Sequence, residues 1–316
     1  MPDKLVRMRR VDGSPSSTRR PVMVAVAGDS AAGKTTLTRG LAQSLGPERV
    51  TVIGADDYHR YDREERKSLP FTALHPDCNH IEIMEQHLQL LAMGQPILKP
   101  VYDHGTGLLT RPRLVEPREF VIVEGLLPLH TKLSRACFDI TVYLDPPEPI
   151  RKQWKIARDT TKRGYSVEQV VAELERREPE SERFIRPQRR FADIIVRFAP
   201  VPERHDPPET PLSAELVLRP TIRHPDLSRI LADSEQHAIH LRLSRDEDGR
   251  PVDALHIHGY APPEESHVVR KAIWSDLGVD AGDPPETLGA LGEGGHSEPL
   301  AITQLLLLYH LVAASR

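Results

Sequence analysis

Short apolar runs alternate with amphipathic stretches over the first two thirds of the chain. The amphipathic stretches, such as Ile81–Met93 and Pro149–Arg163, have the residue spacing of helices. The apolar runs have the composition of buried strands, and they lie at Val22–Ala27, Val50–Ile53, Phe120–Val123, Ile140–Leu144 and Ile194–Phe198. Strands that alternate with helices form a mainly parallel sheet covered on both faces. We therefore predict an α/β fold from Pro21 to about Ala199.

Polar residues follow four of these strands directly. A glycine-containing loop begins at Gly28, and Asp56, Glu124 and Asp145 stand after the next three strands. Because ligands bind at the carboxyl ends of parallel strands, we expect all four features to meet at one edge of the sheet.

A proline-rich segment, Pro200–Pro211, can form neither a helix nor a central strand, and it predicts a domain boundary. We expect a disordered tail at 1–20, the α/β domain at 21–200 and a smaller α+β domain at 201–316. In the last domain we predict strands at Ala238–Arg242 and Ala254–His258, a helix at Glu265–Leu277 and a loop at 278–297. It carries no motif, so we assign it a supporting role.

The loop after the first strand has the spacing G-x-x-x-x-G-K-T, and a predicted helix follows it. Two glycines allow consecutive N–H groups to face phosphate oxygens, and the helix start adds positive potential. Lys34 is placed to reach the β- and γ-phosphates, and Thr35 to bind Mg²⁺. The predicted nucleotide-binding residues are Gly28, Asp29, Ser30, Ala31, Ala32, Gly33, Lys34, Thr35 and Thr36.

Asp56 and Asp57 follow the second strand and suit proton abstraction from a hydroxyl. We predict Asp56 as the general base; Asp57 is a second catalytic candidate, with metal ligation or support of the site as alternatives. Without the phosphate loop upstream, such a pair is typical of a turn or a helix cap. Glu124 is the second metal candidate beside Thr35, and a solvated strand end is its alternative.

Several cationic residues near these carboxylates are candidates for binding the molecule that accepts the phosphoryl group. His59, Arg63 and Lys67 recur every four residues, so a helix there would place them on one face, where they suit an acceptor phosphate. Acidic residues are interleaved, and an ordinary ion-paired surface helix is the alternative. Tyr102 and His104, in a glycine-rich loop, are further candidates for this pocket.

The segment 151–190 is rich in Lys and Arg and is broken at Gly164–Ser166. Arg158 and Arg163 are predicted nucleotide-binding residues of a basic lid, and a solvated basic helix pair is the alternative.

The composition of the chain argues against several other classes of protein. A net charge of −4 argues against a general nucleic-acid binder, and two cysteines, Cys78 and Cys137, are too few for a disulfide framework. The apolar segment 300–314 is interrupted by polar residues and predicts a buried helix or a subunit contact, so we expect no membrane partner. The low number of cysteines suits a reducing cytoplasm, where we expect the protein.

These motifs together resemble the phosphoribulokinase and uridine kinase family of P-loop kinases, and within it phosphoribulokinases. The resemblance covers about residues 21–200 and is weaker beyond. It rests on Gly28–Thr35, Asp56–His59, Asp62–Lys67, Tyr102–Leu109, Val123–Leu126, Trp154–Asp159, Arg163–Ser166 and Pro187–Asp193.

The resemblance implies a P-loop kinase fold, ATP and Mg²⁺ as cofactors, and a homodimer. It implies Asp56 as the base, Lys34 and Thr35 as ATP·Mg²⁺ anchors and Glu124 as the acid after its strand. It further implies a sugar-phosphate pocket formed by His59, Arg63, Arg66, Lys67, Tyr102 and His104. Light-regulated members carry cysteines where this chain has Ala32 and Gly54, so thioredoxin control through that pair is not expected.

The expected activity is ATP-dependent phosphorylation of ribulose 5-phosphate to ribulose 1,5-bisphosphate, the carboxylation substrate of the Calvin cycle. Two alternatives stay open at this point. One is a nucleoside kinase of the uridine kinase type, and the other is a non-catalytic nucleotide-sensing protein.

Overall fold

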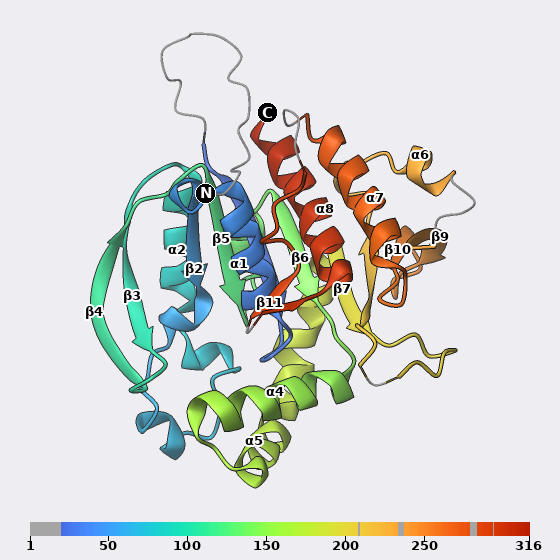
Figure 1. The fold of residues 1–316 in the computed structure, drawn as a ribbon. Helices are drawn as coiled ribbons and strands as arrows, with labels where there is room; N and C mark the ends of the chain where they lie inside the picture. The colour runs from blue at the N-terminus through green and yellow to red at the C-terminus, as the bar shows by residue number, and fades with distance from the viewer. Residues whose placement is uncertain (1–19, 208, 233–236, 279–282, 293) are drawn as a thin grey trace. The chain divides into compact units, whose positions relative to one another are not determined.

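A computed structural model describes residues 20–207, 209–232, 237–278, 283–292 and 294–316. Figure 1 shows its helices and strands. By its contacts the chain divides into two compact units. One contains residues 20–34 and 51–192, and the other contains 35–50 and 193–316. The predicted disordered tail lies outside the described residues, except for Arg20. Arg20 forms a two-bond pair with Asp139.

The first unit is built around parallel strands. β1 (Val22–Gly28) pairs in parallel with β5 (Phe120–Gly125) on one side and with β6 (Ile140–Leu144) on the other. β2 (Val50–Gly54) lies next to β5. Every residue of β1 is buried, which agrees with the predicted cover on both faces. The parallel arrangement expected from the apolar runs is confirmed here.

Helix α2 (Ile81–Ala92) shows how one face of this sheet is covered. Its buried residues Ile81, Met84, Leu88 and Leu91 recur at helical spacing and join one core cluster with strand residues such as Met23 and Val121. The other helices of the unit are α3 (Lys132–Arg135), α4 (Glu148–Arg163) and α5 (Val167–Glu180), and a π-helical turn (Ser181–Ile185) follows α5.

A hairpin that the sequence did not reveal stands beside α2. β3 (Ile97–Asp103) pairs antiparallel with β4 (Leu108–Val115), so Tyr102 lies in a strand rather than in the predicted loop. Pro100 hid the strand from prediction because proline is expected only at edges and irregular positions. It lies where the register of the hairpin shifts.

The helix considered over residues 59–67 does not form, so that interpretation was wrong. A 3₁₀ turn (Ala55–Tyr58) ends where His59 becomes extended and bridges to Asn79, and a second 3₁₀ turn covers Glu65–Ser68. The periodic cations therefore do not share one helix face.

The second unit contains α1 (Lys34–Leu45, from Thr35 onward) and the C-terminal elements. Its antiparallel strands have the order β7-β8-β10-β9. The strands are β7 (Ile194–Ala199), β8 (Ser213–Leu218), β9 (Ile239–Arg245) and β10 (Pro251–Ile257), with a short pair β11 (Ala290–Gly292) and β12 (Gly295–His296). The helices are α6 (Ser228–Leu231), α7 (Pro263–Asp276) and α8 (Glu298–Ser315).

Helix α8 is long and apolar enough to cross a bilayer by length and composition alone. However, 72% of this 18-residue segment is buried within the fold, as in the core helix of a soluble protein.

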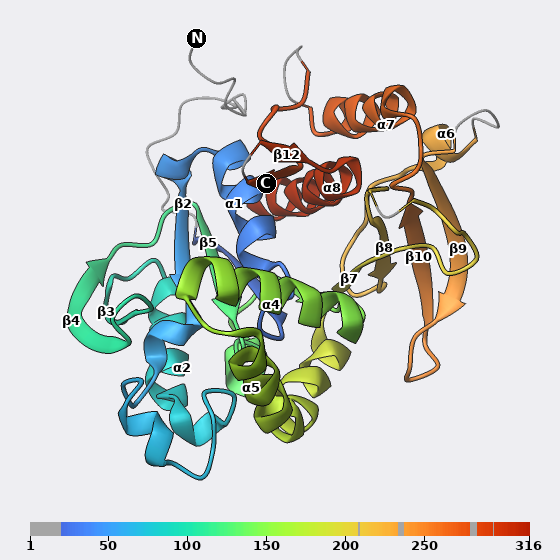
Figure 2. The ribbon, with the colours of Figure 1, turned by 60° about the horizontal axis from the view of Figure 1, so that its bottom comes forward.

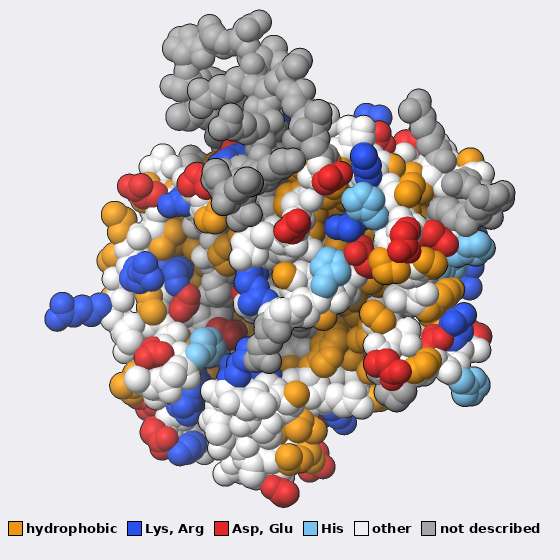
Figure 3. Space-filling model, in the orientation of Figure 1, with side chains coloured by type: hydrophobic (Ala, Val, Ile, Leu, Met, Phe, Trp, Pro, Cys, Tyr) orange, Lys and Arg blue, Asp and Glu red, His pale blue; other side chains and the backbone are white. Residues whose placement is uncertain are grey.

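Acidic and basic side chains are interspersed over the face drawn in Figure 3.

Candidate active site

The phosphate-binding loop turns sharply as it leaves β1. Gly28 and Gly33 have positive φ angles of 147° and 95°, and a Cβ at Gly28 would lie 2.7 Å from the carbonyl oxygen of Leu144. Glycine is thus required where the loop passes β6. Ala31 is also left-handed, with φ 64°, and Ala32 is buried. The loop has the bent backbone that an anion cradle needs.

Lys34 is held inside this loop. Its Nζ donates to the backbone oxygens of Gly28 (2.9 Å) and Asp29 (2.7 Å). Burial lowers the pKa of Lys34, and the charges of Asp56 and Glu124 oppose that shift. The structure therefore brings together three of the predicted site residues, Lys34, Asp56 and Glu124. The register of the sheet contributes to this, because Glu124 pairs with Val26, two residues before Gly28.

Asp56 lies half-buried in the 3₁₀ turn after β2. Burial acts to raise the pKa of Asp56, but nearby positive charge, first from His59 and then from Lys34, outweighs it and lowers the pKa. His104 Nε2 lies 3.8 Å from Asp56 Oδ2. The carboxylate is therefore ionised at neutral pH and able to accept a proton.

Asp57 points to a different partner. One carboxylate oxygen pairs with the ammonium of Lys99, and the other accepts a 2.9 Å bond from the Tyr102 amide. Asp57 thus connects the 3₁₀ turn to β3. Sequence reasoning missed Lys99, since nothing in its neighbourhood marks it as the partner of a residue 42 positions away.

The predicted acceptor residues separate into two groups. His59 is buried, with Nδ1 2.7 Å from Asn79 Oδ1, and its ring lies edge-on to Tyr102. Arg66 donates to the Tyr102 hydroxyl at 2.5 Å, and Arg63 donates to the His104 oxygen at 2.6 Å. The five predicted residues His59, Arg63, Arg66, Tyr102 and His104 therefore lie around the start of the β3–β4 turn.

Lys67 lies apart from that group. Its side chain is 67% exposed and bonds both carboxylate oxygens of Glu64 at 2.8 Å. Its predicted role in acceptor binding stays a prediction. Asp145 likewise has a partner, with Arg189 Nε 3.1 Å from its carboxylate.

Helices α4 and α5 carry the predicted basic lid (Figure 2). Ser166 begins α5 with a capping box, which explains the break after Arg163. Arg158 and Arg163 both approach Asp159 Oδ1, at 2.8 and 3.5 Å, and Arg158 Nη2 lies 3.4 Å from the Ser30 hydroxyl. Arg158 therefore connects α4 to the phosphate loop.

The pair Lys155–Asp159 was not singled out by the sequence analysis. The two charges lie 2.8 Å apart on a buried face of α4. Burial lowers the pKa of Lys155 to about 8. For Asp159, burial is outweighed by hydrogen bonds from Arg158 and Lys155, and its pKa falls to about 2. In the sequence the pair is marked by its i, i+4 spacing and by its place in the Trp154–Asp159 motif.

The donor set suits magnesium. Thr35 and Thr36 form the first turn of α1 directly after Lys34, and Glu124 ends β5. Hydroxyl and carboxylate oxygens are hard ligands, and Mg²⁺ keeps several waters and uses few protein ligands beside phosphate. Among the described residues, no three or more His, Cys, Asp or Glu side chains are placed to hold a metal ion together. An Mg²⁺ ion that is bound mainly by phosphate and water does not need such a group.

Comparison with known proteins places this geometry in a family. The model of the "Phosphoribulokinase / Uridine kinase family" matches residues 23–204. The chain belongs to that family.

Relatives support the same assignment. A phosphoribulokinase from Synechocystis sp. is 42% identical over 181 residues, covering 57% of this chain and 54% of the relative. A uridine kinase from Oceanobacillus iheyensis is 33% identical over 186 residues, covering 56% of this chain and 87% of the relative. The chain spans about half the length of the curated phosphoribulokinases it matches.

The fold has a solved counterpart. The structure of phosphoribulokinase from Rhodobacter spheroides matches with a TM-score of 0.58 at 18% identity, covering 79% of this chain and 94% of that one. The predicted P-loop kinase fold is thus confirmed.

Proposed function

We propose that this protein transfers the γ-phosphoryl group of Mg·ATP to the free primary hydroxyl of ribulose 5-phosphate, giving ribulose 1,5-bisphosphate. The observation that carries the proposal is the group of cations and Tyr102 around the β3–β4 turn. This group approaches the proposed base through His104, whose Nε2 lies 3.8 Å from Asp56 Oδ2. A second anion site beside the base suits an acceptor that already carries a phosphate. The greater identity to a phosphoribulokinase than to a uridine kinase supports the same choice.

In this mechanism the chain mainly aligns groups and compensates charge. Asp56 accepts the proton of the acceptor hydroxyl as its oxygen forms a bond to the γ-phosphorus. The bond between that phosphorus and the β–γ bridging oxygen breaks, and ADP leaves. Lys34 stabilises charge on the β- and γ-phosphates, while Arg158 and Arg163 close from α4.

Thr35 and Glu124 would hold Mg²⁺, directly or through water. When bound, the ion neutralises phosphate charge. Arg63, Arg66, Tyr102, His59 and His104 would form the sugar-phosphate pocket, with Lys67 joining it after exchanging Glu64 for phosphate. Asp57 acts here by fixing the turn that carries Asp56.

A nucleoside kinase is the second candidate, because the uridine kinase relative is covered over 87% of its length. Such an enzyme needs a pocket for a base and has no use for a second anion site. We further propose a cytoplasmic homodimer that supplies a carboxylating enzyme with its sugar bisphosphate.

ADP release at fixed Mg·ATP with ribulose 5-phosphate, uridine or pantothenate tests the proposal. We expect turnover with ribulose 5-phosphate only. Arg63→Ala should raise the KM for this acceptor at least about tenfold, the scale of a lost charge-assisted contact. The exposed Arg111 on β4 supplies a matched control, Arg111→Ala, which should leave that KM unchanged. Turnover of uridine with none of the sugar phosphate would reject the proposal in favour of a nucleoside kinase.

A further inference from the structure

The phosphate loop contains an acidic residue, Asp29, at its second position. A carboxylate beside bound phosphates opposes their binding. Its charge already reaches the middle of the loop, since Asp29 is among the groups that raise the pKa of Lys34. The loop can hold a triphosphate only if this charge is compensated elsewhere.

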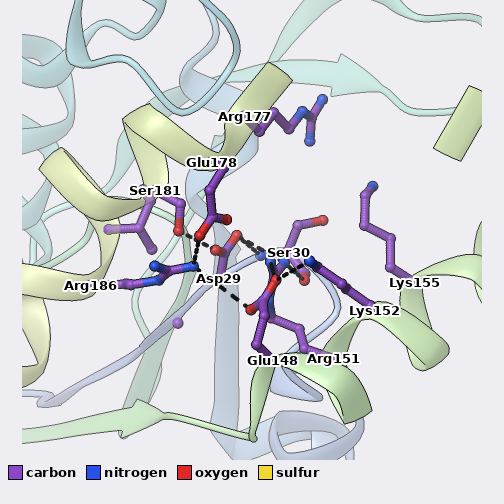
Figure 4. Close-up of polar contacts among 12 residues, drawn as sticks. Asp29, Ser30, Glu148, Arg151, Lys152, Lys155, Arg177, Glu178, Ser181 and Arg186 are labelled. Atoms are coloured by element: carbon purple, nitrogen blue, oxygen red, sulfur yellow. Dashed lines mark hydrogen bonds and ion pairs between the residues drawn. The ribbon is translucent and has the colours of Figure 1, made fainter. Parts of the chain in front are cut away.

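The compensation comes from α4 and from the turn after α5 (Figure 4). Asp29 is buried, with 6% of its surface exposed. Its Oδ1 accepts a 2.5 Å bond from the Ser30 amide and lies 3.5 Å from Arg151 Nη1. Its Oδ2 accepts a short bond from the Ser181 hydroxyl. Both oxygens therefore face partners.

Arg151 contacts the loop twice. Besides its ion pair with Asp29, its Nη1 donates to the Ser30 backbone oxygen at 3.1 Å. The side chain of Arg151 is only 5% exposed, so its charge is little screened by solvent. One guanidinium thus neutralises the carboxylate and fixes the backbone beside it.

The network continues away from the loop with alternating charges. Glu148 accepts two bonds from Arg151, at 2.8 and 2.6 Å, and Arg186 donates to Glu178 at 2.6 Å. Arg186 also lies 3.8 Å from Glu148. These residues connect the start of α4, the end of α5 and the segment after the π-helical turn, all within one unit.

We propose that Asp29 is a positioning residue: it shapes the phosphate loop through Ser181 and Arg151, and Arg151 cancels its charge so that the loop accepts a triphosphate. This inference rests on the proposed nucleotide-binding function of the loop. It assigns Asp29 and Arg151 no contact with the reacting atoms.

The two substitutions Arg151→Met and Asp29→Asn should therefore act on nucleotide affinity in opposite directions when they are combined. Arg151→Met leaves a buried carboxylate uncompensated beside the phosphates, which is worse than having neither charge. Asp29→Asn keeps the shape and the Ser181 bond but removes the charge. Combining the two substitutions should therefore restore part of the nucleotide affinity that Arg151→Met loses, whereas two independent structural losses would add.

The test measures the Kd of a fluorescent N-methylanthraniloyl ATP with Mg²⁺ on the full chain. We expect Arg151→Met to raise this Kd about tenfold or more, and the double variant to recover at least about threefold of it. Lys152→Met is the matched control, because Lys152 is the next cation on α4 and is half-exposed; its Kd should equal that of the wild type. Arg151→Lys keeps the charge but cannot form both bonds to Glu148, so it should lose less nucleotide affinity than Arg151→Met without matching the wild type.

Acceptor kinetics separate positioning from general damage. The KM for ATP should rise in Arg151→Met while the KM for the acceptor stays within about twofold, as only nucleotide binding is affected. A double variant no better than Arg151→Met, or equal losses for both substrates, would overturn the inference. If the wild type binds the nucleotide and the double variant shows the recovery, but the wild type phosphorylates no sugar phosphate, the proposed function fails while this inference stands.

Discussion

At the scale of single residues, the site depends on an aspartate that stays ionised although it is half-buried. Burial alone would raise the pKa of Asp56 and keep it protonated more often. The charges of His59, Lys34, His104 and Arg177 reverse that tendency. The same cations that suit phosphate binding thus keep the proposed base ready to accept a proton.

Asp56→Asn should lower kcat by roughly 10²–10⁴-fold, the usual contribution of a general base, because the amide cannot accept the proton. Nucleotide affinity should change little, which a fluorescence titration checks. Since the pKa of Asp56 is lowered, protonation of this residue should not limit the wild-type rate until the pH falls below 3.8, its ordinary pKa. A variant that retains most of the wild-type kcat would show that another group removes the proton.

The sequence predicted which residue types meet at the site better than it predicted their partners. Lys34, Asp56 and Glu124 could be located because a local motif or a strand end fixes each of them. The roles of Asp57 and His59 could not be read, since their partners Lys99 and Asn79 come from segments brought near only by folding.

At the scale of elements, helix α1 has a glycine in its interior where alanine would favour the helix. The structure explains Gly40 by packing within the second unit, because a Cβ there would overlap the side-chain amide of Gln304 on α8. Gln304 is fully buried and donates to the oxygens of Thr36 and Leu37, each at 3.3 Å. It thereby lies along the first turns of α1.

Gly40→Ala should therefore lower the free energy of unfolding by roughly 1–3 kcal/mol, as overpacking in a core does, despite alanine's higher helix propensity. Urea titration measures the loss. Adding Gln304→Ala should return part of it, because the shorter side chain makes room for the new methyl group. If Gly40→Ala is as stable as the wild type, the close packing described here is not the reason for the glycine.

The β9–β10 pair carries a stack of histidines. His240 stacks on His256 and His258, with ring centroids 4.4 and 4.8 Å apart, and its Nδ1 lies 2.7 Å from His258 Nε2. Burial lowers all three pKa values, and a nearby arginine adds to each shift. Repulsion by His256 also lowers the pKa of His240, and repulsion by His240 and His256 helps to lower that of His258 to about 4, whereas Glu215 opposes the shift at His256. The folded stack therefore favours neutral imidazoles.

Acidification should destabilise this pair of strands. Between pH 6.5 and about 4 the unfolded chain binds protons that the folded stack does not, so stability falls as the pH falls. Thermal melts at pH 7.5 and 5.5 check this, and His258→Gln should reduce the difference between the two. Equal pH sensitivity in both proteins would assign the effect to other groups.

At the scale of the whole molecule, the family match and the compact units do not coincide. The match ends at residue 204. Helix α1 begins at the phosphate loop, but its contacts group it with residues 193–316. Sequence could not reveal this division. The proline-rich segment after residue 199 marks a boundary along the chain, whereas α1 is grouped by contacts with residues far along the chain, such as Gln304 on α8. The predicted domain limits at 21–200 and 201–316 stay a proposal about the chain order.

A fragment of residues 1–204 should consequently fail to fold as a stable kinase, although it contains the entire family match. Removing residues 205–316 takes away Gln304 and Thr287, which contact α1 at Thr36, Leu37 and Ser44, and most of the residues with which α1 forms a compact unit. Each apolar side chain that the removal exposes costs roughly 1.5–3 kcal/mol, which is large against the usual net stability of a domain. We expect no cooperative thermal transition and no stabilisation by Mg·ATP, and co-expression with residues 205–316 should restore both if the two pieces associate. A fragment that melts cooperatively and gains stability from Mg·ATP would show that α1 is supported without the C-terminal helices.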